Sequence, residues 1–244
     1  MHRFFIPKEQ ITKDQVIITG SDVNHIKNVL RLKAGDKIEV FDSSQNNYLI
    51  EITSYSHELI RGNIISKQSS NLESSIKITL AQCLVKGKKM DLIIKMATEL
   101  GVYKIIPVIS ERSIPKIEEK EEKKIEHWQG IAKEAAEQSG RNLVPKIESL
   151  KRIDDLNPSG YDLAIMPWEG EKTKSLKEIL MHASAPVHQC AILVLIGPEG
   201  GFSLSEAESA KKAGFTTVSI GKRILRCETA ALATLSQIFY ELEN

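Results

Sequence analysis

The chain has 244 residues, 41% of them hydrophobic and 27% charged, which is typical of a globular protein of one large or two modest domains. Lys and Arg (33) nearly balance Asp and Glu (32), and this net charge of +1 neither requires nor excludes a nucleic-acid partner. The apolar runs are too short to span a membrane and the N-terminus lacks a signal-peptide core, so we expect no membrane association.

Cysteine and histidine usage narrows the function classes further. The three cysteines have no C-x-x-C spacing, which favours a reducing, cytoplasmic location over a disulfide scaffold. The six histidines include no H-E-x-x-H motif or clustered set. We therefore expect no bound metal.

The first 70 residues are dominated by short segments of β composition separated by polar turns. The predicted strands are Gln15–Thr19, Lys37–Phe41, Tyr48–Tyr55 and Leu59–Ser66. One helix is expected at Asp22–Leu30, and the pattern as a whole favours a small barrel. The polar stretch Lys67–Ser75 is typical of a linker, which predicts domains at residues 1–70 and 76–244.

Strands alternate with helices after this linker. The predicted strands are Ile76–Leu84, Lys104–Ile109, Tyr161–Met166, Ala191–Ile196 and Thr216–Ile220. The predicted helices are Lys89–Leu100, Lys116–Ser139, Ser175–His182, Ser203–Ala213 and Glu228–Leu242. Ser203 with Glu206 has capping-box spacing. The alternation predicts an α/β fold with a parallel sheet covered by helices on both faces.

Two glycine-containing loops follow buried strands near the C-terminus. The first is IGPEGGFS, starting at Ile196, and the second is IGKRILRCETAAL, starting at Ile220. Glycine permits unusual backbone angles and close approach of a ligand, and ligands of open α/β sheets bind at the carboxyl ends of the strands. We therefore expect one composite pocket. The G-x-G-x-x-G fingerprint and the phosphate loop are absent, which removes the usual support for nicotinamide, flavin or ATP.

The second loop also carries unusual charges. Arg223 and Arg226 stand in an otherwise apolar segment, next to Ile224 and Leu225. The apolar neighbours favour at least half-buried positions for these two arginines over full solvation. Buried or half-buried arginine normally has an anionic or carbonyl partner.

These loops resemble the two signature loops of the RsmE family of ribosomal RNA uridine methyltransferases, within the SPOUT (α/β trefoil-knot) superfamily. Further matches occur in order along the chain, at His25–Arg31 with Gly35-Asp36, Lys86–Asp91 with Thr98–Val102, Ser110–Ser113 and Glu134–Arg141. Two departures affect the second loop, which has Lys222 where proline is common and Cys227 where threonine is usual.

The resemblance implies a knotted SPOUT methyltransferase domain preceded by a PUA-like RNA-binding β-barrel. It implies a homodimer that binds S-adenosylmethionine, releases S-adenosylhomocysteine and methylates N3 of a uridine in 16S rRNA near the decoding centre. The expected partner is 16S rRNA within the small ribosomal subunit, and the choice between naked rRNA and the assembled subunit as substrate stays open. A SPOUT enzyme with another RNA target and a PUA-type binding or assembly protein without catalysis are the alternatives.

The family pattern also implies site residues. The cofactor-binding set is Met166, Leu195, Ile196, Gly197, Glu199, Gly200, Gly201, Ile220, Gly221, Ile224, Leu225, Arg226, Thr229 and Ala230. Arg226, and after it Arg141, are the candidates for stabilising negative charge on the uracil as N3 loses its proton. For Glu199 and Glu228 we favour a structural role over that of proton acceptor.

RNA binding requires cations that face phosphates. The candidates are Arg3, His25, Lys27, Arg31, Lys86, Lys88, Lys89, Arg112, Arg141 and Arg223. Taken one at a time, a lysine of this set is more often a solvated surface charge.

Overall fold

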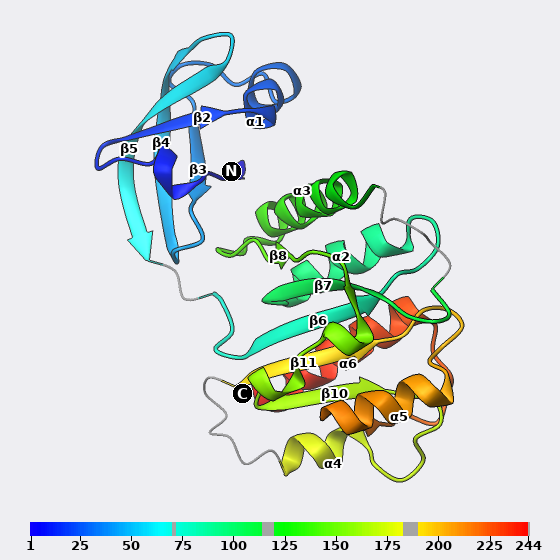
Figure 1. Ribbon diagram of the computed structural model, residues 1–244. Helices are drawn as coiled ribbons and strands as arrows, with labels where there is room; N and C mark the ends of the chain where they lie inside the picture. The colour runs from blue at the N-terminus through cyan, green and yellow to red at the C-terminus, as the bar shows by residue number, and fades with distance from the viewer. Residues whose placement is uncertain (70–71, 114–119, 183–189, 244) are drawn as a thin grey trace. The chain divides into compact units, whose positions relative to one another are not determined.

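The computed structural model describes residues 1–69, 72–113, 120–182 and 190–243. These residues form two compact units (Figure 1). The N-terminal unit comprises Met1–Glu73 together with Ala136–Val144, and the C-terminal unit comprises Ser74–Ala135 together with Pro145–Asn244.

The N-terminal unit is built on one curved sheet with the strand order β1-β3-β4-β5-β2. Its strands are β1 (Arg3–Phe5), β2 (Gln15–Thr19), β3 (Lys37–Phe41), β4 (Asn46–Tyr55) and β5 (Leu59–Ser69). Strand β1 runs parallel to β3, and the other pairs are antiparallel. Alternate residues such as Val16 and Ile18 or Ile50 and Ile52 are fully buried, because side chains of a strand alternate between its faces.

Four features of this unit differ from the sequence-based expectation. No pairing among the described residues closes the sheet, which is therefore a half-barrel. Residues 67–69 belong to β5 and not to a linker, because they pair with Tyr48, Asn47 and Asn46 of β4. The expected helix starts as α1 (Ser21–Asn24) and continues as a π-helical stretch over His25–Val29. The short strand β1 was not anticipated.

The C-terminal unit contains an all-parallel sheet with the order β12-β10-β11-β6-β7-β8, and β9 also pairs with β7. The strands are β6 (Lys77–Cys83), β7 (Lys104–Ile109), β8 (Lys146–Ile147), β9 (Lys151–Arg152), β10 (Leu163–Pro167), β11 (Ala191–Ile196) and β12 (Thr216–Val218). The parallel sheet is confirmed. The two-residue strands β8 and β9 are too short to leave a pattern in the sequence.

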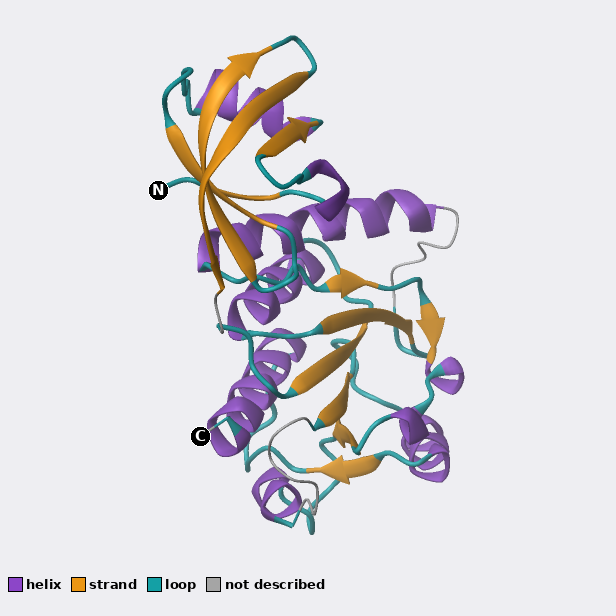
Figure 2. Cartoon of the chain, turned by 90° about the vertical axis from the view of Figure 1, so that its left-hand side faces the viewer, coloured by secondary structure: helices purple, strands orange, loops and turns teal. Residues whose placement is uncertain are grey.

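Helices cover both faces of this sheet (Figure 2). They are α2 (Lys89–Leu100), α3 (Glu121–Ser139), α4 (Leu176–Met181), α5 (Leu204–Ala213) and α6 (Cys227–Leu242). Helix α5 lies on one face, where Ala207 and Ala210 pack against Leu193 and Leu195, and α2 and α6 pack together on the other (Figure 1). Residues 116–119 of the predicted long helix lie outside the described residues. The capping box of α5 is confirmed, since Ser203 and Glu206 bond reciprocally.

The segment after α3 is joined to the rest of the N-terminal unit by two partly buried charged side chains, Arg3 and Glu73. The Arg3 guanidinium donates to the Arg141 carbonyl and to Asn142 Oδ1. The Glu73 carboxylate accepts from Arg141 Nη2 at 2.6 Å and from the backbone N–H groups of Asn142 (2.8 Å) and Leu143 (3.0 Å). Charge-assisted hydrogen bonds of this kind are stronger than neutral ones, so they fasten residues 136–144 to this unit.

We expect Glu73→Ala to lower the free energy of unfolding by about 3–5 kcal/mol, because it removes a carboxylate that bonds the buried Arg141 guanidinium and two backbone N–H groups. Urea unfolding measures this change. Glu58→Ala, at an exposed position of the same unit, is the control and should change stability by at most about 0.5 kcal/mol. Equal unfolding midpoints for the two variants would contradict a stabilising role for Glu73.

Candidate functional site

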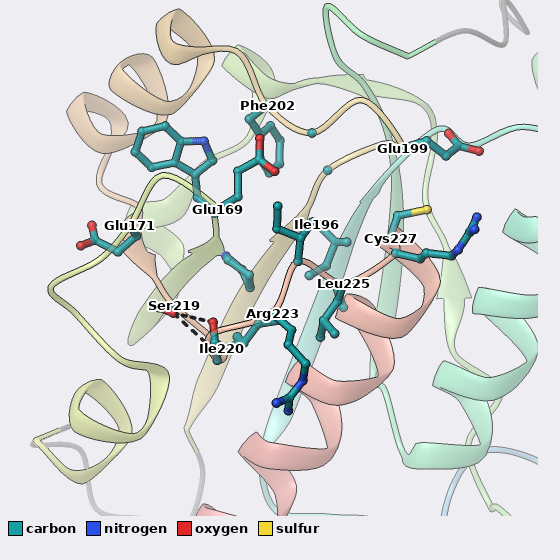
Figure 3. Close-up of a pocket in the computed structure, with 18 of the residues that line it drawn as sticks. Glu169, Glu171, Ile196, Glu199, Phe202, Ser219, Ile220, Arg223, Leu225 and Cys227 are labelled. Carbon is teal, nitrogen blue, oxygen red and sulfur yellow. Dashed lines mark hydrogen bonds between the residues drawn. The ribbon is translucent and has the colours of Figure 1, made fainter.

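Three loops meet at one edge of the parallel sheet. Residues 168–174 follow β10, residues 197–203 follow β11 and residues 219–226 follow β12. These strands are neighbours in the order β12-β10-β11, and the carboxyl ends of parallel strands lie at the same edge. The loops enclose a cavity of about 220 Å³ (Figure 3).

The cavity has apolar walls and a charged rim. Its larger apolar lining residues are Pro167, Trp168, Ile196, Phe202, Ile220, Ile224 and Leu225. Its charged lining residues are Lys89, Glu169, Glu171, Lys172, Glu199, Lys222, Arg223 and Arg226. A mostly apolar cleft with a few polar groups is the usual form of a small-molecule site.

Two glycines of these loops are required by geometry. At Gly197, an added Cβ would lie 3.1 Å from the Phe202 ring, so a side chain there would displace one wall of the cavity. Gly221 has φ +143°, a conformation that residues with a side chain rarely adopt.

The Glu199 carboxylate ties the first glycine loop to the segment that follows β6. Its Oε1 accepts from the Lys86 backbone N–H at 3.1 Å and from Lys89 Nζ at 2.9 Å. Partial burial raises the pKa of Glu199, but the hydrogen bonds from Lys89 and from backbone N–H groups outweigh it and hold the pKa below its usual range. This arrangement supports the structural role that we favoured for Glu199.

The loop that follows β7 braces the same glycine loop from another side. Arg112 Nη1 donates to the Gly200 carbonyl at 2.8 Å. An added Cβ at Gly200 would lie 3.2 Å from the Cβ of Arg112, so this glycine faces the Arg112 side chain and not the cavity. The buried Glu206 carboxylate accepts from the backbone N–H groups of Glu111 (2.7 Å) and Ser203 (2.9 Å) and joins the two loops.

The arginines of the second loop are exposed, which corrects the expectation that they are at least half-buried. Ile224 between them is itself 82% exposed, so the apolar composition of this segment does not shield its charges. Within the described residues, neither Arg223 nor Arg226 makes an ion pair. Figure 3 shows the Arg223 side chain directed away from Ile196. Arg226 lines the cavity from the position just before α6.

Cys227 lies at the cavity as a protonated thiol. Its Sγ donates to Glu228 Oε2 at 3.0 Å. Burial, and after it the hydrogen bond to Glu228, raises the pKa of Cys227 to about 12. The same bond lowers the pKa of Glu228. A thiol in this state is not a nucleophile at neutral pH.

Most of the residues expected to bind the cofactor line the cavity. They are Ile196, Gly197, Glu199, Gly201, Ile220, Gly221, Ile224, Leu225, Arg226 and Ala230. The others do not: Met166 and Leu195 are fully buried in their strands and face the core under α5, Gly200 faces Arg112, and Thr229 is exposed on α6.

The expected RNA-binding residues divide between the two units. Arg3, His25, Lys27, Arg31 and Arg141 belong to the N-terminal unit, and Lys86, Lys88, Lys89, Arg112 and Arg223 to the C-terminal unit. Only Lys89 and Arg223 of this set line the cavity. The guanidinium of Arg141, the second catalytic candidate, is bonded to Glu73 and is not part of the cavity wall.

The family resemblance implied a third cofactor loop near Met166 and Pro167, but it named none of the residues that follow β10. Trp168, Glu169, Glu171 and Lys172 all line the cavity, as does Phe202 in the first glycine loop. Trp168 and Glu169 come directly after the strand, so the rule that ligands bind at carboxyl ends would have found them. Glycine content drew attention to the other two loops only.

The described residues contain no group of three or more His, Cys, Asp or Glu side chains that could hold a metal ion. No helix in the same ranges is both long and apolar enough to cross a membrane.

Comparison with known proteins agrees with this architecture. A family model of an RNA methyltransferase domain matches residues 72–239, and one of an RNA methyltransferase PUA domain matches residues 18–65. The chain is 35% identical to ribosomal RNA small subunit methyltransferase E of Bacillus subtilis, covering 100% of this chain and 98% of the relative. It is 34% identical to the protein of the same name from Mesomycoplasma hyopneumoniae, covering 97% and 98%.

Solved structures give the same result in three dimensions. A ribosomal RNA small subunit methyltransferase E from Neisseria gonorrhoeae, bound to S-adenosylmethionine, matches with a TM-score of 0.84 and 33% identity over 98% of this chain and 97% of the other. A Legionella pneumophila protein solved with bound cofactor S-adenosylmethionine matches with a TM-score of 0.88 and 31% identity, over 98% and 96%.

The half-barrel unit, the parallel sheet with its loop-lined cavity and these matches define an RNA methyltransferase with an N-terminal PUA domain. Within that class, the chain belongs to the ribosomal RNA small subunit methyltransferase E family. The family resemblance found in the glycine loops is thereby confirmed.

We expect Cys227 to resist alkylation in the folded protein at pH 8. Its thiolate is scarce below the raised pKa of about 12, so labelling should accelerate only as the pH rises towards that value. Peptide mass spectrometry after iodoacetamide treatment measures this, and denatured protein, in which all three cysteines react, is the control. Rapid labelling of Cys227 at pH 8 would refute the assignment of an inert thiol.

Proposed function

We propose that this protein transfers a methyl group from S-adenosylmethionine to N3 of a uridine in 16S rRNA, near the decoding centre of the small ribosomal subunit. The observation that carries the proposal is the cavity formed by three loops at adjoining ends of β10, β11 and β12. Relatives of the same fold are bound to S-adenosylmethionine.

The residues of the cavity fit this cofactor. Apolar side chains such as Ile196, Ile220 and Leu225 suit the adenine ring and the carbon chain. The glycines that line the cavity allow a ligand to approach the backbone closely, and the Glu169 carboxylate suits its ammonium group. Bound there, S-adenosylmethionine supplies an electrophilic methyl group.

Arg226 is the residue that we propose to act on the uracil. N3 must lose its proton as it accepts the methyl group, and a fixed cation stabilises the negative charge that develops on the ring. The Arg226 guanidinium lines the cavity, is exposed and makes no ion pair within the described chain, so it is free to contact substrate. Glu199 and Glu228 already hold hydrogen bonds, which supports structural roles for both.

RNA binding falls to both units in this proposal. Residues 1–70 supply affinity through exposed cations such as Lys27 and Arg31, and residues 76–244 carry out the reaction. Lys86 and Lys88 are exposed beside the cavity wall formed by Glu199 and Lys89. A uridine inside folded RNA must be extruded before its N3 can enter the site.

We also propose a cytoplasmic homodimer with the knotted threading of the SPOUT superfamily. Ile224 on the second loop and Tyr240 on α6 are 82% and 78% exposed. Large apolar groups in such positions favour contact with a second copy of the chain.

The function is tested by mapping N3-methyluridine in 16S rRNA from a strain that lacks the gene, together with calorimetric titration of the purified protein with S-adenosylmethionine. We expect one modified position to disappear and the cofactor to bind. Methylation lost at a site in another RNA would favour the enzyme with a different target. Absence of cofactor binding would favour the non-catalytic PUA-type protein.

Arg226→Ala should lower the single-turnover rate of methyl transfer about a hundredfold or more, the scale of removing one group that stabilises a developing charge. Arg226→Lys should restore only part of the rate, because it keeps the charge but loses the planar fork.

Cofactor affinity, measured by calorimetry, is the control for Arg226 and should stay nearly unchanged. Lys212→Ala, at an exposed position of α5, should behave as the wild type in both measurements. Loss of cofactor binding in proportion to the rate would show that Arg226 anchors the loop and does not act on the uracil.

A further inference from the structure

The loop that follows β10 is organised around a carboxylate that is almost completely buried. Glu171 is 8% exposed although it stands in the wall of the cavity. Its Oε1 accepts from the Thr173 backbone N–H (2.9 Å), the Thr173 hydroxyl (2.7 Å) and the Lys174 backbone N–H (3.2 Å). One carboxylate oxygen therefore satisfies the donors of the turn that it closes.

The second oxygen connects this loop to another strand. Glu171 Oε2 accepts from the hydroxyl of Thr217 in β12 at 2.7 Å, and Thr217 is 2% exposed. Strand β12 leads directly into the second glycine loop, which forms the opposite part of the cavity lining. The Glu171–Thr217 bond thus joins two walls of one cavity.

Backbone hydrogen bonds hold only the ends of the loop, one to β12 and one to Ser219 directly after it. Near its start, the Trp168 N–H donates to the Val218 carbonyl at 3.1 Å. At its end, the Ser219 N–H donates to the Lys174 carbonyl at 2.8 Å. Glu171 supplies the contact to β12 from the middle of the loop.

The middle of the loop determines where its lining side chains lie. An added Cβ at Gly170 would be 2.5 Å from the Trp168 ring, so the indole lies directly against the backbone next to Glu171. Lys211 Nζ of α5 lies 5.1 Å from the centroid of the same ring. A shift of the backbone at Gly170 would therefore move the Trp168 ring that lines the cavity. Glu169 lies in the same turn.

We propose that Glu171 is a positioning residue which, through its hydrogen bond to Thr217, holds Trp168 and Glu169 in the cavity wall before the cofactor arrives. The inference rests on the proposed binding of S-adenosylmethionine in this cavity. A wall that is ordered in advance removes the free-energy cost of ordering it on binding, so its loss weakens cofactor affinity and leaves the methyl-transfer step unchanged.

Thr217→Val is the decisive variant because it keeps the β-branched shape and removes only the hydroxyl. It leaves Oε2 of a buried carboxylate without its donor, and we expect the calorimetric Kd for S-adenosylmethionine to rise about tenfold or more. The single-turnover rate at saturating cofactor should stay within about twofold of the wild type, since Glu171 is not proposed to touch the reacting atoms.

Two further variants separate positioning from general stability. Glu171→Gln can still accept from Thr173 and Lys174 through its carbonyl and donate to the Thr217 hydroxyl through its amide, so its Kd should rise much less. Thr216→Val, next along β12 and outside the cavity lining, is the matched control and should bind as the wild type.

Two results would overturn the inference while leaving the proposed function intact. One is an unchanged Kd for Thr217→Val, with or without a lower unfolding temperature. The other is an equal rise in Kd for Thr217→Val and Thr216→Val. Failure of the wild-type protein to bind S-adenosylmethionine would instead reject the proposed function together with the inference.

Discussion

The parallel pairing of β10 with β11 and β12 is the constraint on which the rest of the site depends. Met166 pairs with Thr217 and Ile165 with Val194, so the three strands end at a common edge. Loops that leave this edge must meet, whatever their sequences. Reversal of any one strand would send its loop to the opposite edge and open the cavity.

Buried or partly buried carboxylates hold these loops in shape. Glu171 fastens the loop after β10 to β12, Glu199 fastens the first glycine loop to the segment after β6, and Glu206 joins Ser203 to Glu111. Each carboxylate accepts from backbone N–H groups that regular secondary structure leaves without partners. The hydrogen bonds from Thr217 and then Thr173 hold the pKa of Glu171 at about 2, so this carboxylate remains charged across the physiological pH range.

The two arginines at the cavity that we propose to contact the substrate are not among the charges that hold the fold. Glu73 and Arg141 bond to each other, and Arg112 donates a hydrogen bond to the Gly200 carbonyl. Arg223 and Arg226 are exposed at the cavity and make no ion pair within the ranges described. A cation that makes no internal ion pair keeps its full charge for contact with a substrate.

The sequence alone determined the type of most elements, the carboxyl-edge location of the cavity and the family. Period-2 burial in β2 and β4, glycine after β11 and the Ser203–Glu206 cap are local signals, because each depends on residues only a few positions apart. The tertiary structure decided that residues 136–144 join the N-terminal unit, that Gly200 faces Arg112 and that Glu171 reaches Thr217. It also decided that an apolar segment leaves Arg226 exposed. These contacts join residues 46 or more positions apart or follow from packing around a loop. A periodic pattern in the sequence does not specify which distant strand a given segment will lie beside.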